Sequence, residues 1–152
     1  MFIKKEIGEI YSMLITWKPE YSVNIAEIDK QHQKLVSLLS DMLDVTNRDD
    51  DFDHYDEIIA IFDELSDYTV KHFAFEEELL REYNYSAMDM KIHELEHSSF
   101  IRKVVQIRQQ DLDKNEQGIL RDTIKFLVDW IEQHILDTDQ KYAPFLIENG
   151  VS

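Results

Sequence analysis

The fold and the chemistry of this chain are set by the stretch His72 to Asp139, which contains HFAFE (72–76), HELEH (93–97) and HILDTD (134–139). In an α-helix, side chains four residues apart lie on the same face, about 5 to 6 Å apart at Cβ. His72 with Glu76, and His93 with His97, can therefore each direct two donor atoms the same way. Each pair could chelate one ion, so the pattern predicts a metal site built on helices.

The third segment has a different spacing. His134 and Asp139 are five residues apart, and an ideal helix would place them roughly 140° apart. We therefore expect Asp139 to reach the site only where the last helix distorts or ends, and Asp137 to point elsewhere. A further histidine, His32 in IDKQH, shares a helical face with apolar residues and is predicted to point inward.

These segments together supply five imidazoles and two carboxylates. The set is too large for one zinc ion, which closes a tetrahedron of four donors. It suits two ions that share bridging carboxylates, and a sulfur-free, nitrogen-rich set with open positions suits iron, although manganese and zinc accept the same donors. A purely structural role would leave these groups buried without partners, which is costly. A metal site is therefore the favoured interpretation.

The wider sequence predicts one all-α domain. Its 152 residues are 43% hydrophobic, with only three glycines and two prolines, which favours long helices with few tight turns. Apolar residues at helical spacing predict an antiparallel up-and-down four-helix bundle. The expected helices are Ala26 to Thr46, Tyr55 to Tyr83, a third from a Ser86 cap to Leu112, and Ile119 to Leu136.

Two segments precede this bundle. Residues Met1 to Thr16 have apolar side chains at helical spacing and predict a short amphipathic helix, which either packs on the bundle or associates with another chain. Residues Trp17 to Ile25 contain a proline and no sustained helical period, so we expect an extended arm across the bundle. Trp17, Tyr21 and Val23 are its predicted buried anchors.

Charge and composition exclude several functions. The formal charge is −16, from 32 acidic and 16 basic residues, which opposes binding to nucleic acid or anionic lipid. The chain has no cysteine, which excludes disulfides and thiolate-held clusters. No run approaches the roughly 20 apolar residues of a membrane span, and the charged N-terminus lacks a signal peptide's apolar centre. We expect a soluble, cytoplasmic protein.

The order of the motifs resembles the hemerythrin family, in its bacterial branch. A single histidine is followed by H-x-x-x-E, H-x-x-x-H and H-x-x-x-x-D. The surrounding segments also resemble those of the family; they are IDKQHQKLV, HFAFEEELL, HELEHSSF and HILDTDQKY. The resemblance covers about Ile15 to Tyr142, so residues 1–16 form an extension and 17–152 a hemerythrin-like bundle. One small departure is Tyr85-Ser86, where a proline often follows the tyrosine.

The resemblance implies a cofactor of two iron ions in a non-haem centre bridged by an oxo or hydroxo group. It assigns His93, His97 and His134 to one iron, and His32 and His72 to the other. Glu76 and Asp139 would bridge the two ions. The second iron has one imidazole fewer and would keep the position at which dioxygen binds. The sixth histidine, His54, lies in the acidic run Asn47 to Glu57 and is left outside the site.

The function that the resemblance implies is reversible dioxygen binding, for carriage or storage, and not an enzymatic reaction. A sensor that signals to a partner through residues 1–16, a peroxidase or oxidase, and the handling of iron or nitric oxide are alternatives that the same site permits. Helical phase predicts four residues that would line the dioxygen pocket, although ordinary core packing explains each of them too. They are Leu35, Phe73, Trp130 and Ile131.

Overall fold

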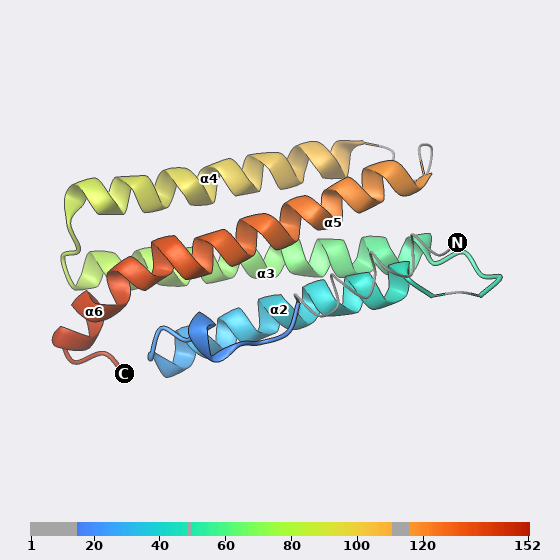
Figure 1. Cartoon of the computed structure of the whole chain (residues 1–152). Helices are drawn as coiled ribbons and strands as arrows, with labels where there is room; N and C mark the ends of the chain where they lie inside the picture. The colour runs from blue at the N-terminus through green and yellow to red at the C-terminus, as the bar shows by residue number, and fades with distance from the viewer. Residues whose placement is uncertain (1–14, 49, 111–115) are drawn as a thin grey trace.

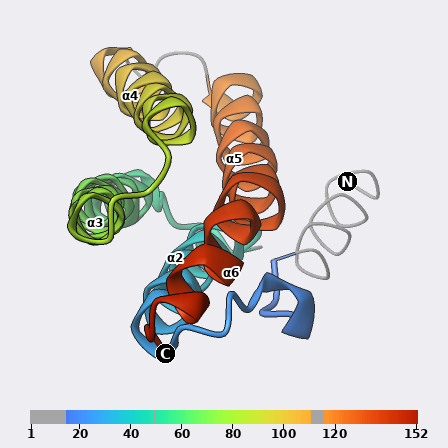
Figure 2. The ribbon, with the colours of Figure 1, turned by 90° about the vertical axis from the view of Figure 1, so that its left-hand side faces the viewer.

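The computed structural model describes residues 15–48, 50–110 and 116–152, and this part of the chain is helical without strands. Its long helices run antiparallel (Figure 1) and occupy the four corners of a bundle when viewed from the end (Figure 2). They are α2 (Ala26–Thr46), α3 (Tyr55–Glu82), α4 (Ala87–Gln109) and α5 (Glu116–Gln133). The predicted four-helix bundle is confirmed.

The helix boundaries follow the apolar periodicity closely. Helix α2 has the predicted bounds, and α3 ends one residue early. Ser86 is the residue before α4, as predicted, but its side chain makes no capping hydrogen bond. Helix α4 ends at Gln109, three residues before the predicted end, because Gln110 has an extended backbone conformation. Helical period locates an element reliably, whereas its last turn depends on local backbone conformation.

The C-terminal end of the bundle differs from the prediction. Helix α5 does not stop near Leu136 but continues into a π-helical turn, His134–Asp139, and then into α6 (Gln140–Glu148). Figure 1 shows α6 beyond the end of α5, turned toward the start of α2. A π-helical turn closes i→i+5 hydrogen bonds, so it brings residues five apart onto one face. The expected distortion is therefore present, without the expected end.

The connection between α3 and α4 is a tight turn stabilised by its own backbone. The Tyr85 N–H donates to the Leu80 carbonyl at 2.9 Å, and the Asn84 N–H donates to the Arg81 carbonyl at 3.1 Å. Asn84 has a φ of 59°. This pair of bonds with a left-handed residue is the Schellman motif, which ends a helix and satisfies its last carbonyls. It lets α4 return at once beside α3.

Asn84 gives the first prediction. Asparagine tolerates the left-handed conformation better than other residues with a Cβ, so Asn84→Ala is expected to destabilise the chain by about 1 kcal/mol, whereas Asn84→Gly is expected to be neutral or stabilising. Urea unfolding measures both. The control is Asn47→Ala, at an exposed helix end where φ is −92°. Equal losses for Asn84→Ala and Asn47→Ala would contradict the argument.

The N-terminal arm is tied to the first turn of α2. The Ser22 hydroxyl and the Val23 N–H donate to the Asp29 carboxylate at 2.5 and 2.8 Å. Tyr21 and Val23 are buried, as predicted, but Trp17 is only partly buried. The arm also contains a short 3-10 turn, Pro19–Tyr21, which the prediction of a fully extended arm did not include. The helix predicted for Met1 to Thr16 lies outside the described residues except for its last two.

The core consists of two apolar clusters separated by polar side chains. Along α2, Ile28 belongs to the smaller cluster beside α6, and Leu35 belongs to the larger cluster that fills the rest of the bundle. Buried His32 lies between them. The other long helices repeat this order, so a polar layer crosses the bundle between two apolar ones. None of the helices in the described ranges has the length and apolar character that crossing a membrane requires.

Candidate metal centre

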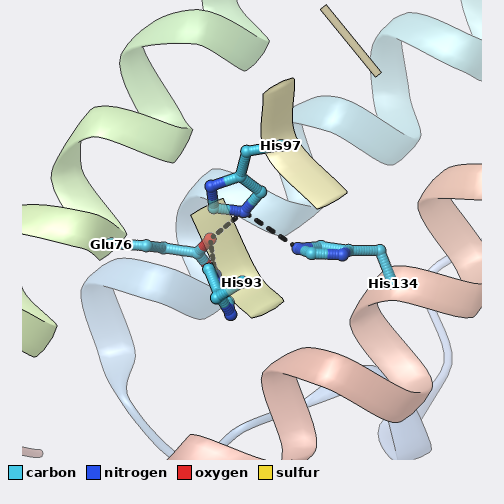
Figure 3. Close-up of side chains that lie close together, drawn as sticks. All are labelled: Glu76, His93, His97 and His134. Carbon is cyan, nitrogen blue, oxygen red and sulfur yellow. Dashed lines mark hydrogen bonds and ion pairs between the residues drawn. The ribbon is translucent and has the colours of Figure 1, made fainter. Parts of the chain in front are cut away.

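The polar layer contains all seven predicted ligands, and each is buried. Their donor atoms form two groups in which all atoms lie within 4.8 Å of one another. Figure 3 shows the first group, whose side chains come from α3, α4 and the π-helical turn that follows α5. The first group is Glu76, His93, His97 and His134, and the second is His32, His72, Glu76 and Asp139. The structure therefore brings together all seven residues that were predicted from the sequence as metal ligands.

The π-helical turn places His134 and Asp139 in this layer. Its i→i+5 pattern places the two side chains on the same face, and His134 Nε2 lies 3.2 Å from Asp139 Oδ1. Asp137 points away from the site, as predicted, and it is exposed and pairs with Lys141 at 3.5 Å. The site thus depends on a local departure from α-helical geometry. Single π-helical turns within α-helices are frequent at functional sites.

Each buried carboxylate divides its two oxygens between the two groups. Glu76 places Oε1 3.3 Å from His72 Nε2, and Oε2 3.3 Å from both His93 Nε2 and His97 Nε2. Asp139 places Oδ2 3.1 Å from His32 Nε2 and Oδ1 3.2 Å from His134 Nε2. This is the arrangement in which one carboxylate can bind two ions at once.

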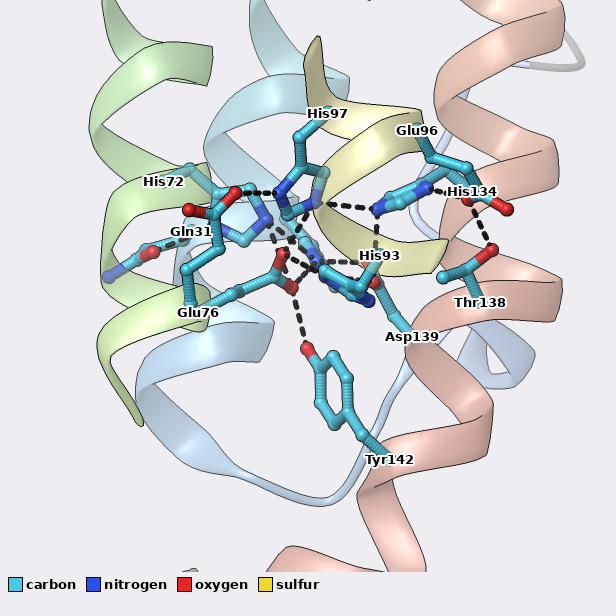
Figure 4. Close-up of polar contacts among 12 residues, drawn as sticks. Gln31, His72, Glu76, His93, Glu96, His97, His134, Thr138, Asp139 and Tyr142 are labelled. Carbon is cyan, nitrogen blue, oxygen red and sulfur yellow. Dashed lines mark hydrogen bonds and ion pairs between the residues drawn. The ribbon is translucent and has the colours of Figure 1, made fainter. Parts of the chain in front are cut away.

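Hydrogen bonds on the outer side of three histidine rings define which nitrogen faces the site (Figure 4). Amide and carboxylate oxygens accept, so the Nδ1–H of each ring must donate to them, and in the neutral ring Nε2 carries the lone pair. The pairs are His72 with Gln31 at 2.7 Å, His97 with Glu77 at 2.8 Å and His134 with Glu96 at 2.8 Å. The lone pairs of these rings therefore converge inside the bundle.

The geometry requires positive charge between these atoms. His97 Nε2 lies 3.0 Å from His134 Nε2, and His32 Nε2 lies 3.1 Å from His72 Nε2. Two lone pairs at this distance repel unless a proton or a cation lies between them. Neither oxygen of Asp139 has a hydrogen-bond partner among the described residues. Such a buried set is the donor environment that two metal ions satisfy.

The pKa values show the same need for positive charge. Burial lowers the pKa of His134, but the negative charge of the adjacent Asp139 and the hydrogen bond that the ring donates to Glu96 outweigh it, and the pKa rises to about 10. Burial likewise lowers the pKa of His32, yet Asp139 and Glu76 raise it to about 9. In the metal-free chain, protons thus supply the charge. Metal binding at this site must displace them.

The prediction missed the outer partners of the ligands. They are Gln31, Glu77, Glu96, Thr138 and Tyr142. Tyr142, which is fully buried, donates from its hydroxyl to Glu76 Oε1 at 2.6 Å, and the Thr138 hydroxyl donates to Glu96 at 2.6 Å. Residues next to a ligand lie about 100° away on a helix, which made most of these look solvated. The available signal was a polar side chain directly beside several of the ligands in the sequence.

The predicted pocket residues fall into two kinds. Phe73 stacks on His97 with ring centroids 3.7 Å apart, and Trp130 stacks on His134 at 4.5 Å. Leu35 and Ile131 are buried in the larger apolar cluster. Phe73 and Trp130 therefore pack directly on ligand rings, on the side of the larger apolar cluster. His54 lies away from the layer, with its Nε2 2.7 Å from Asp50, as its exclusion from the site requires.

A four-helix bundle that buries five imidazoles and two shared carboxylates defines a class of protein, the dinuclear metal proteins of the bundle type. The comparisons identify the family within this class. Residues 23–146 match the family model described as the hemerythrin HHE cation binding domain. The chain belongs to the hemerythrin family.

Its relatives cover nearly the same span. A bacteriohemerythrin of Clostridium acetobutylicum is 33% identical over 85% of this chain and 98% of its own length. A bacteriohemerythrin of Methylococcus capsulatus is 29% identical over 88% and 97%. A crystal structure of a hemerythrin leucine-to-tyrosine mutant superimposes with a TM-score of 0.72 at 28% identity, over 85% of this chain and 94% of that one.

Membership of the family indicates which cofactor the site binds. The hemerythrin family binds a di-iron centre, and the two ligand groups could hold two ions. The two groups of donor atoms and the family membership are independent observations, and both indicate two metal ions. Together they support a di-iron, oxygen-binding role for the chain.

Proposed function

We propose that this chain binds dioxygen reversibly as a carrier or store, at a di-iron centre held by the seven buried residues. The observation that carries the proposal is the division of oxygens between the two groups by Glu76 and Asp139. In this assignment His93, His97 and His134 hold one ion. His32 and His72 hold the other, and the two carboxylates bridge them.

The unequal number of histidines supports binding of an external ligand. The ion held by His32 and His72 has one protein ligand fewer than its neighbour, so it has room for a small molecule. A bound pair of ferrous ions would supply the electrons and the open coordination position that reversible dioxygen binding needs. The chain supplies the orientation, because outer hydrogen bonds fix the rings of His72, His97 and His134.

The surroundings of the site favour carriage over oxidation chemistry. Apolar clusters lie on both sides of the ligand layer, and excluding water from a reactive centre suppresses side reactions. We assign the pocket lining to Phe73, Trp130, Leu35 and Ile131. The donor set also contains more neutral imidazoles than carboxylates, which stabilises high-valent iron less than a carboxylate-rich set does. We therefore propose a non-enzymatic role.

A sensor would use the same di-iron site, but unlike a carrier it would pass a structural change to a partner protein. Residues 1–16 precede the matched span 23–146, and such an extension could transmit a change to another chain. Deletion of these residues distinguishes the two roles. A carrier is expected to keep its association state and its oxygen binding, whereas a sensor is expected to lose partner or self association.

An optical experiment tests the proposal. The optical spectrum of the anaerobically reduced, iron-loaded protein is recorded before air is admitted, after air is admitted, and again after argon has removed the oxygen. Ligand-to-iron charge-transfer bands are expected to appear with air and to vanish under argon. An oxidised spectrum that argon cannot reverse would contradict reversible binding and favour a redox sensor or an oxidase.

Paired histidine variants test the ligand assignment. His72→Ala is expected to abolish the reversible optical change, because it leaves the second ion with a single imidazole. His54→Ala is expected to leave that change intact, since His54 bonds to Asp50 in a loop. Iron content and the oxygenation spectrum measure both variants. Loss of oxygen binding in His54→Ala, with His72→Ala unaffected, would show that the assignment of the sixth histidine is wrong.

A further inference from the structure

The two ligand groups differ in the charge behind their histidines. In the three-histidine group, the Nδ1 atoms of His97 and His134 bond to the carboxylates of Glu77 and Glu96, each at 2.8 Å. In the two-histidine group, the Nδ1 atom of His72 bonds to the neutral amide of Gln31 at 2.7 Å. The Nδ1 atom of His32 has no partner among the described residues. Negative charge is therefore placed behind one group only.

Both outer carboxylates are held in place by other residues. Glu77 accepts from Arg81 through its second oxygen at 3.2 Å, and Glu96 accepts from the Thr138 hydroxyl at 2.6 Å. Their side chains are 21% and 39% exposed, so water screens their charge only in part. Each carboxylate thus keeps one oxygen directed at a ligand ring.

Such contacts change what a histidine can do for a metal. A carboxylate that accepts the Nδ1–H fixes the ring and raises the basicity of Nε2, and losing such a partner typically lowers metal affinity about 10- to 100-fold. An amide oxygen has no net charge and polarises the ring less. A ring without a partner, such as His32, gains neither effect. The difference between the two groups therefore extends beyond the number of histidines.

From these contacts we infer that the three-histidine position binds its ion first and more tightly, and that Glu77 and Glu96 are the positioning residues that establish this order. The inference rests on the di-iron centre proposed above. It predicts that a chain with one equivalent of metal holds its ion at His93, His97 and His134. The position that is open to dioxygen fills last and empties first.

Stepwise titration of the metal-free chain with ferrous iron tests the order of filling. The titration is anaerobic, with a competing chromogenic chelator. The wild type is expected to show two steps of unequal affinity. His72→Ala is expected to keep the tight step and lose the weak one, and His134→Ala is expected to lose the tight step. If His72→Ala removes the tight step instead, the order is reversed and the inference fails.

Isosteric variants test the two carboxylates. Glu77→Gln and Glu96→Gln are each expected to weaken the tight step about tenfold and to leave the weak step nearly unchanged. The matched control is Glu94→Gln on α4, whose carboxylate bonds to Arg81 at 2.7 Å and to no ligand. Unchanged steps in the two variants, or equal weakening of both steps, would overturn the role of Glu77 and Glu96.

A gain-of-charge variant makes the test independent of any loss of folding. Gln31→Glu places a carboxylate behind His72 and is expected to tighten the weak step, which narrows the gap between the two affinities. An unchanged or weakened second step would count against the inference. If the wild type binds no iron at all, the proposed di-iron centre fails. If the wild type shows two binding steps that the Glu77 and Glu96 variants leave unchanged, the centre stands and only the inference about these carboxylates fails.

Discussion

Replacing Glu76 with alanine is expected to abolish reversible dioxygen binding and to lower the iron content below two ions per chain. Glu76 directs Oε1 to one group of converging donors and Oε2 to the other. Its loss would remove a donor from each of the two proposed ions and leave the Tyr142 hydroxyl, which donates to it, without that buried partner. Iron per chain and the oxygenation spectrum measure the effect.

The neighbouring carboxylate provides the control for this variant. Glu78 lies two residues further along α3 and is exposed, so Glu78→Ala is expected to retain two irons and full oxygen binding. Both variants remove the same functional group from the same helix. If Glu76→Ala still took up two irons and bound dioxygen reversibly, a bridging role for this residue would be untenable.

Removal of the metal is expected to produce the largest change in stability. An ion present at about 1,000 times its dissociation constant stabilises the folded chain by about 4 kcal/mol. In a chain of this size 1 kcal/mol shifts the Tm by about 2 to 4 °C. Removing two such ions, worth about 8 kcal/mol together, is therefore expected to lower the Tm by roughly 16 to 32 °C. Scanning calorimetry before and after chelation measures the shift.

Two comparisons show whether the shift comes from the centre. Ferrous iron added back to the metal-free chain without oxygen is expected to restore the original Tm. The same chelation is expected to move the Tm of Glu76→Ala far less, because that variant holds its metal weakly. A wild-type Tm that chelation leaves unchanged would mean that the buried polar layer is stable without metal.

The positions of the ligands could be predicted from the sequence because they depend on local periodicity. A spacing of four fixes the relative direction of His93 and His97 on any helix, and a run of apolar residues fixes which face is buried. The same rule identified His32 as inward-facing. The sequence by itself therefore predicted the four helices and the inward-facing histidines, and the resemblance of the motif order to the hemerythrin family completed the proposed set of seven ligands.

Only the tertiary structure decided how these residues meet. The π-helical turn at His134–Asp139 could be expected as a distortion, but its form depends on how α5 and α6 pack against the arm and α2. The oxygens that Glu76 turns to each group depend on the rotation of α3 relative to its neighbours. The outer partners Glu77 and Glu96 reach histidines on other helices. Contacts between helices depend on their register and rotation, and no spacing within one helix contains that information.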